Sequence, residues 1–97
     1  MLTAQINIEP IRKMCEENDV DMLGVFGSFA RGESTTDSDI DLLVRFSKRK
    51  GLLSMIRLER EISEALGRDV DLLTEGAISP YLRDQILSDL RILYGKE

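Results

Sequence analysis

The chain has 97 residues, of which 42% are hydrophobic and 32% are charged, and its formal net charge is −5. This length and balance predict one soluble, folded domain over residues 1–97 and exclude a disordered chain. The negative charge argues against direct, non-specific binding to nucleic acid. It leaves a nucleotide ligand open, because a bound dication can invert the local field. The absence of histidine excludes histidine-based general bases and the usual zinc sites.

Cysteine content and hydropathy bear on the compartment. Cys15 is the only cysteine, so no disulfide can form within the chain, and we expect an inert thiol in the core. No apolar run approaches the roughly 18 residues that a membrane span needs. The first residues, MLTAQINIEPIRK, lack the pattern of a secretory signal. The sequence therefore predicts a cytoplasmic protein without a membrane contact.

The first predicted helix ends at the pair Asn18-Asp19. Apolar residues recur before it at helical spacing, and Asn7 is a candidate N-cap with Pro10 tolerated in the first turn. The spaced apolar residues are Ile8, Ile11, Met14 and Cys15. Residues 20–26 (VDMLGVF) follow and are dense in apolar side chains. That density is typical of a strand buried on both faces.

The middle of the chain alternates strands with helical segments. Residues 27–37 (GSFARGESTTD) predict a tight turn, a short helix and a loop, and residues 40–46 (IDLLVRF) predict a second strand. Residues 51–67 predict an amphipathic helix that ends at a glycine. Residues 70–73 predict a short third strand, and the apolar tail at 92–94 either pairs or packs.

Ser79-Pro80 predicts the start of a last helix that runs to about Leu90, with Ser79 as its cap. We expect its apolar face to belong to the core, and that face consists of Leu82, Ile86 and Leu90. The order of elements predicts an α/β (α+β) fold, in which helices pack against a small sheet. The pattern alone does not decide between a parallel and a mixed sheet.

Asp39 and Asp41 are the most informative pair in the chain. Strand side chains alternate faces, so these two carboxylates project from one face about 6.5–7 Å apart. They repel by on the order of 2.4 kcal/mol at an effective dielectric near 20. A bound cation, a raised pKa of one aspartate or solvation would offset this repulsion. The usual cation in such a place is magnesium, which bridges carboxylates and substrate phosphates. The alternative without a metal is that Asp39 caps a turn and that Asp41 is solvated.

Two further segments fit a phosphate and metal site. Gly27-Ser28 follows the first strand, where glycine permits close approach of an anion and serine presents its hydroxyl. The alternative is a turn with a helix cap. Asp71 precedes two leucines much as Asp41 does, so we favour Asp71 as a third carboxylate and regard Asp69 as solvated or capping.

A calcium-binding EF-hand loop is the competing interpretation of the acidic run at 37–41. That loop requires glycine at its sixth position and glutamate at its twelfth. Those positions hold Leu42 and Lys48, so the calcium loop is excluded.

The strings GSFARGE (27–33) and SDIDLLV (38–44) together resemble the signature of the polymerase-beta-like nucleotidyltransferase superfamily, in particular its minimal, antitoxin-type members. The resemblance implies a small mixed sheet flanked by helices. It also implies that two magnesium ions hold a nucleoside triphosphate on Asp39 and Asp41. Asp71 would complete the metal site and help to activate the acceptor hydroxyl. Gly27 and Ser28 would cradle the phosphates.

Two basic elements stay open at this point. Arg31 matches the pattern either as a phosphate contact or as a structural ion pair. The run Lys48-Arg49-Lys50 is interpreted as a solvated loop, with attraction for phosphates as the alternative.

Larger members of the superfamily append domains that bind the acceptor, and this chain has no room for one. The resemblance therefore implies transfer of AMP from ATP to a tyrosine of a partner, a ribonuclease toxin of the HEPN type. Two alternatives remain. The chain could neutralise its partner by contact, with a silent site, or it could adenylylate a small molecule as the aminoglycoside adenylyltransferases do.

Overall fold

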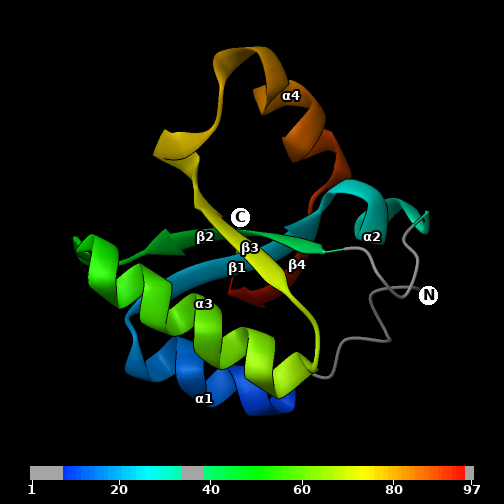
Figure 1. The fold of residues 1–97 in the computed structure, drawn as a ribbon. Coiled ribbons are helices and arrows are strands. Elements are labelled where there is room, and N and C mark those ends of the chain that lie inside the picture. The colour runs from blue at the N-terminus through cyan, green and yellow to red at the C-terminus, as the bar shows by residue number, and fades with distance from the viewer. Residues whose placement is uncertain (1–7, 34–38, 96–97) are drawn as a thin grey trace.

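A computed structural model describes residues 8–33 and 39–95. Four helices, four strands and one 3₁₀ turn follow one another in the described chain (Figure 1). In order they are α1 (Glu9–Glu17), β1 (Val20–Phe26), α2 (Gly27–Arg31), β2 (Ile40–Phe46), α3 (Leu52–Leu66), β3 (Val70–Thr74), η2 (Glu75–Ala77), α4 (Pro80–Asp89) and β4 (Arg91–Gly95).

The strands form one mixed sheet in the order β3-β2-β1-β4. β1 lies antiparallel to both β2 and β4, whereas β2 and β3 run parallel. The mixed sheet that the family resemblance implied is confirmed. The first two strands have their predicted bounds, and the third extends one residue further, to Thr74. The apolar tail pairs with β1 and becomes the edge strand β4.

The helix ends follow local chemistry. Asn18 ends α1, and its Nδ2 donates to the carbonyl of Met14 over 2.7 Å. Ser79 caps α4 as predicted, because its Oγ accepts from the amide of Tyr81 over 3.3 Å. The candidate cap Asn7 lies outside the described residues. No helix within residues 8–33 and 39–95 is both long enough and apolar enough to cross a membrane.

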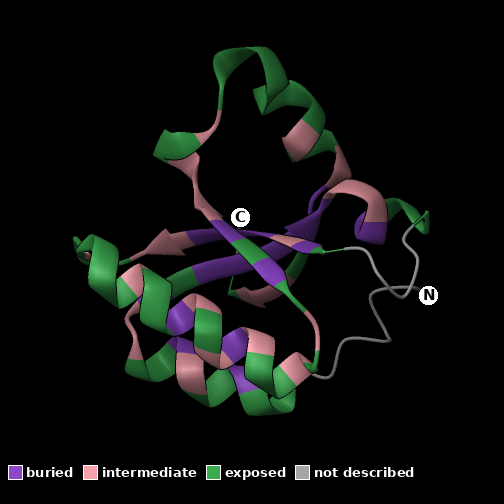
Figure 2. Ribbon diagram, viewed as in Figure 1, coloured by how far each residue is buried: buried purple, intermediate pink, exposed green. Residues whose placement is uncertain are grey.

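α1 and α3 cover one face of the sheet and make the main core (Figures 1 and 2). The completely buried side chains of this core are Ile11, Cys15, Leu23, Val25, Leu42, Val44, Leu58 and Ile62. Burial raises the pKa of the Cys15 thiol to about 11. That value agrees with the expected inert core thiol, because the thiolate is the reactive form.

The opposite face of the sheet is only partly covered. A smaller apolar cluster lies there, made of Met22, Phe26, Leu43 and Leu90 with Leu73, Ile78 and Ile86 beside it. The prediction that the whole apolar face of the last helix is core is wrong at Leu82, which is 53% exposed. The last helix meets α2 and β1, and its first turns project away from the sheet (Figure 1).

β3 is an edge strand that receives a side chain from α3. The carboxylate of Glu59 accepts a hydrogen bond from the amide of Leu72 over 2.8 Å. An edge amide that would otherwise need water is thereby paired within the protein.

Candidate active site

β2 and β3 bring Asp41 and Asp71 side by side. The two residues are register partners in the parallel pair, and neighbouring strands lie about 4.8 Å apart. Their side chains project from the face opposite α1 and α3, because Leu43, two residues after Asp41, belongs to the smaller cluster on that face. Asp39 immediately precedes β2 and is exposed, as is Asp71, whereas Asp41 is half-buried.

The carboxylates influence one another electrostatically. The pKa of Asp41 is raised, first because burial removes water from its carboxylate and then because Asp71 and Asp39 place negative charge nearby. Arg31 opposes this rise. The negative charge of Asp41 is therefore only partly compensated by the surrounding residues.

The first residue of α2 packs directly on Asp41. Gly27 has φ +75°, a backbone conformation that residues with a Cβ rarely adopt. A Cβ atom at this position would lie 2.5 Å from Oδ2 of Asp41, so a side chain there would have to displace this carboxylate. Ser28 follows and is half-buried. The two halves of the sequence motif, which the chain separates, thus meet at one point, because Phe26 before the turn is the register partner of Asp41.

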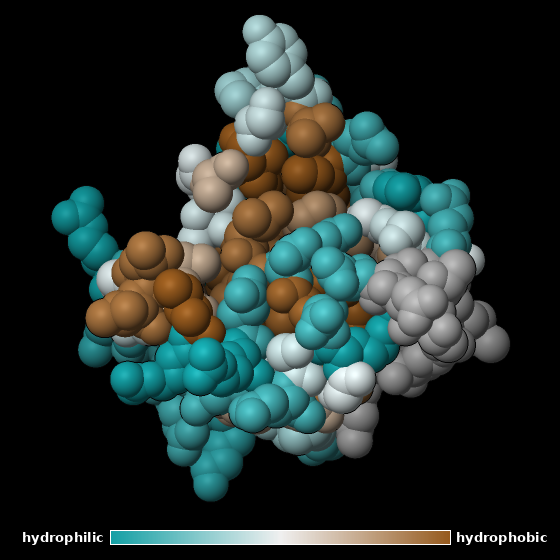
Figure 3. Space-filling model, viewed as in Figure 1, coloured by the Kyte–Doolittle hydropathy of each residue, from teal (hydrophilic) through white to brown (hydrophobic). Residues whose placement is uncertain are grey.

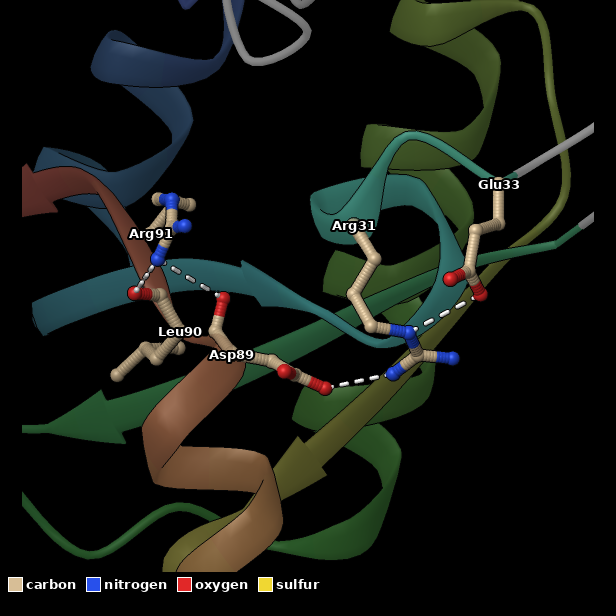
Figure 4. A network of polar contacts seen from close by, with 5 residues as sticks. All are labelled: Arg31, Glu33, Asp89, Leu90 and Arg91. Carbon is tan, nitrogen blue, oxygen red and sulfur yellow. Dashed lines mark hydrogen bonds and ion pairs between the residues drawn. The ribbon is translucent and has the colours of Figure 1, made fainter.

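Arg31 lies at the end of α2 and makes two ion pairs (Figure 4). Its Nη1 donates to Oδ2 of Asp89 over 2.6 Å, and its Nε donates to Oε1 of Glu33 over 3.1 Å. These bonds raise the pKa of the guanidinium. The structural ion pair that the sequence left open is therefore present. Asp89 had no signal in the sequence, because it is 58 residues away from Arg31.

An open groove of about 420 Å³ runs along this edge between α3 and β3. Asp39, Asp69 and Asp71 line it from the sheet. Asp69 is exposed, as expected of a solvated residue, and its carbonyl accepts from the amide of Ile40 over 3.0 Å. A second hollow, of about 530 Å³, lies between α1 and α3 and has none of the candidate residues in its lining.

The carboxylates of the candidate site suit magnesium both as oxygen ligands and through their negative charge. Magnesium prefers oxygen ligands, and it usually completes its shell with water and substrate phosphates. The raised pKa of Asp41 and the glycine turn against its carboxylate mark a place where positive charge is favourable. As they stand, no three acidic or thiol side chains in the described part of the chain converge tightly enough to enclose an ion.

The basic run at 48–50 lies beyond the far end of β2 from Asp41. Lys48 and Arg49 are exposed, and Nζ of Lys50 contacts Oδ2 of Asp19 over 2.6 Å. This placement favours the solvated loop over a contact with phosphates.

Comparison with known proteins identifies the family. Residues 9–97 match the model of the family described as polymerase beta, nucleotidyltransferase. A protein of Methanocaldococcus jannaschii, named a putative protein adenylyltransferase, is 49% identical over 65 residues, which are 67% of this chain and 70% of that protein. Protein adenylyltransferase MntA of Thermococcus cleftensis is 35% identical over 79 residues, which are 81% of this chain and 80% of the relative.

Similarity in structure agrees with similarity in sequence. The crystal structure of a toxin–antitoxin with AMP-PNP superposes with a TM-score of 0.79 and 26% identity. The match covers 95% of this chain and 76% of the other. Family match, relatives and fold agree with the resemblance seen in the motif, and the relatives carry the names of transferases. This chain belongs to the polymerase beta nucleotidyltransferase family.

Proposed function

We propose that this chain uses magnesium to transfer AMP from ATP to a hydroxyl group of a partner protein. The observation that carries the proposal is the contact of Gly27 on α2 with Asp41 on β2, next to Asp71 on β3. A phosphate-binding turn and paired carboxylates thereby share one site. The relatives named protein adenylyltransferase and the similar toxin–antitoxin structure with AMP-PNP, an ATP analogue, support the choice of nucleotide.

Asp39, Asp41 and Asp71 are the residues that would hold magnesium, as two ions in the pattern of the superfamily. Magnesium bound there would neutralise the triphosphate and the departing pyrophosphate. Gly27 and Ser28 bind the phosphates, because the missing side chain leaves the backbone open and the hydroxyl is a donor. The proposed site therefore combines cation ligands and phosphate donors on one face of the sheet.

The proposed reaction is an in-line displacement. A bond forms between the acceptor oxygen and the α-phosphorus, and the bond from that phosphorus to the bridging oxygen of pyrophosphate breaks. Asp71 is exposed and register-paired with Asp41, so it is placed to accept the proton of the acceptor hydroxyl. The products are the adenylylated hydroxyl and pyrophosphate.

The resemblance to antitoxin-type members extends the proposal to the acceptor. We propose that it is a tyrosine of a HEPN-type ribonuclease toxin, and that the pair acts in the cytoplasm. The relative MntA of Thermococcus cleftensis, named a protein adenylyltransferase, and the similar toxin–antitoxin crystal structure support a toxin protein as the acceptor. The choice of a tyrosine rests on the resemblance. Modification of the toxin would silence it.

The test uses α-labelled ATP and magnesium, with and without the protein encoded by the neighbouring gene. We expect label on that protein with the wild-type chain and with Asp21→Asn, because Asp21 is an exposed aspartate of β1 that pairs with Arg45. Asp39→Asn and Asp41→Asn should give no label. Transfer that survives in both of these variants would exclude the assigned site.

A contact-only antitoxin is the second candidate, and exposed apolar side chains favour it. Figure 3 shows apolar groups gathered at the start of α3 and beside α4. Leu52 is 74% exposed, Leu53 79% and Tyr81 96%. If Asp39→Asn still forms the complex and still neutralises the partner, this second function replaces the first. If the complex forms but neutralisation is lost, the transferase is supported.

A further inference from the structure

Asp89, the last residue of α4, forms a bridge between two elements that are far apart in the chain. Its Oδ2 accepts from Nη1 of Arg31 on α2 over 2.6 Å (Figure 4). The side chain of Asp89 is only 17% exposed, the least of any carboxylate in the ion pairs of residues 8–33 and 39–95. A short, sheltered, charge-assisted bond of this kind is stronger than an ordinary surface pair.

The orientation of Arg31 is set by two carboxylates. Asp89 binds Nη1, and Glu33 binds Nε over 3.1 Å. The third nitrogen, Nη2, makes no hydrogen bond to the described part of the chain. A guanidinium is planar, so two fixed nitrogens also fix the direction of the third.

Arg31 lies beside the proposed phosphate turn. Gly27 and Arg31 are four residues apart on α2, a spacing that places them on the same side of a helix about 5–6 Å apart. Gly27 in turn abuts the carboxylate of Asp41. The guanidinium of Arg31 therefore lies at the rim of the carboxylate face, where the phosphates of a bound nucleotide would be, and its Nη2 has no partner within residues 8–33 and 39–95.

From this geometry we infer that Asp89 is a positioning residue, which holds the guanidinium of Arg31 for a contact with the phosphates of ATP. The inference rests on the proposed function. The ion pair and the phosphate contact are then two parts of one device, because the pair fixes in advance the rotamers that phosphate binding would otherwise have to order. α4 thereby contributes to nucleotide affinity although none of its residues is among the proposed magnesium or phosphate ligands.

The experiment measures the Kd for AMP-PNP with magnesium, and the KM and kcat for AMP transfer. We expect Asp89→Asn to raise Kd and KM about tenfold with a smaller change in kcat, since a lost charge-assisted contact costs about that factor. Asp89→Glu should recover part of the loss. Asp21→Asn breaks the pair with Arg45, which lies at the end of β1 and β2 away from Gly27 and Asp41, and should change neither constant.

A double-mutant cycle separates positioning from plain stabilisation. Arg31→Ala should raise Kd at least as much as Asp89→Asn, and Asp89→Asn should have no further effect in the Arg31→Ala background. A lower Tm in both single variants with an unchanged Kd would overturn the inference. Arg31→Lys keeps the charge but loses the planar guanidinium, and it provides a second test if Asp89→Asn folds poorly. An unchanged Kd in Arg31→Lys would also overturn the inference.

The outcomes distinguish this inference from the function on which it rests. A wild-type chain that neither binds AMP-PNP nor transfers AMP would refute both. A wild-type chain that does so, beside an Asp89→Asn variant with unchanged constants, would refute the positioning role alone.

Discussion

The two faces of the sheet use the same strands for different purposes, and β2 shows this most clearly. Ile40, Leu42 and Val44 point to the face covered by α1 and α3 and are at most 2% exposed. Asp41, between them, points to the other face, is half-buried and has a raised pKa. One face is packed apolar core, and the other combines a smaller apolar cluster with the carboxylate of Asp41, whose charge Arg31 offsets only in part.

This difference shows which face of the sheet supplies the stability of the fold. Acids on a poorly compensated face lower stability, and only a protein with an adequate core elsewhere tolerates them. The covered face supplies that core through side chains from both helices, among them Cys15, Leu58 and Ile62. We therefore expect substitutions on the two faces to have separable effects on stability and on activity.

The largest effect is expected on the covered face. Leu42→Ala removes a completely buried side chain and leaves a cavity, so it should lower the free energy of unfolding by about 2–5 kcal/mol. Urea unfolding measures this change. AMP transfer per folded molecule should stay near the wild-type value. A loss below about 1 kcal/mol would show that the core relaxes and that the two faces are not so different.

On the open face, Asp41→Asn should reverse this pattern. Loss of a proposed magnesium ligand should reduce AMP transfer by about 100-fold or more, as removal of a single stabilising group of a transition state does. The free energy of unfolding should stay equal or rise, because the variant removes a carboxylate that neighbouring acids repel. Label transfer and urea unfolding are measured on the same preparation. A marked loss of stability would assign Asp41 a structural role.

Gly27→Ala tests the contact between the turn and the carboxylate. A left-handed φ and a Cβ that would overlap Asp41 should together cost about 1–2 kcal/mol of stability and displace the carboxylate, with loss of transfer. Gly67→Ala is the matched control, because Gly67 also has a left-handed φ, of +70°, but no described atom beyond its own chain neighbours lies within 4 Å of a Cβ built there. Equal behaviour of the two variants would contradict the described packing.

The smallest effect concerns pH. Because the pKa of Asp41 is raised above its ordinary value of 3.8, the folded chain binds this proton more tightly than the unfolded chain. Its contribution to the free energy of unfolding is therefore most favourable below pH 3.8, and it falls as pH rises toward the raised pKa. The change should be below about 1 kcal/mol, since solvent screens the group.

The difference between wild type and Asp41→Asn, followed by urea unfolding from pH 3 to pH 7, isolates this contribution. Asp19, whose pKa is lowered by Lys50, acts in the opposite direction and cancels in the difference. A difference that does not change with pH would mean that Asp41 titrates alike in both states.

Local sequence patterns predicted the helices and strands, and they also assigned Asp39, Asp41 and Asp71 to one candidate site. The strand at 40–46 could be predicted because an apolar run starts beside two aspartates. The cap of α4 could be predicted because Ser79 precedes Pro80. Contacts between distant segments were beyond such reasoning. The bond of Asp89 to Arg31 and the exposure of Leu82 depend on how α4 sits against α2 and β1, which no periodicity encodes.

The bond from Leu72 to Glu59 has a consequence for how this molecule meets others. A free strand edge invites another chain to extend the sheet, a route to aggregation and to indiscriminate pairing. At β3 the outward amide of Leu72 is already taken by a side chain of the same molecule, so this point of the edge is closed to backbone pairing. A protein that binds along β3 at this position must therefore recognise side chains, because it cannot form backbone hydrogen bonds with the strand there.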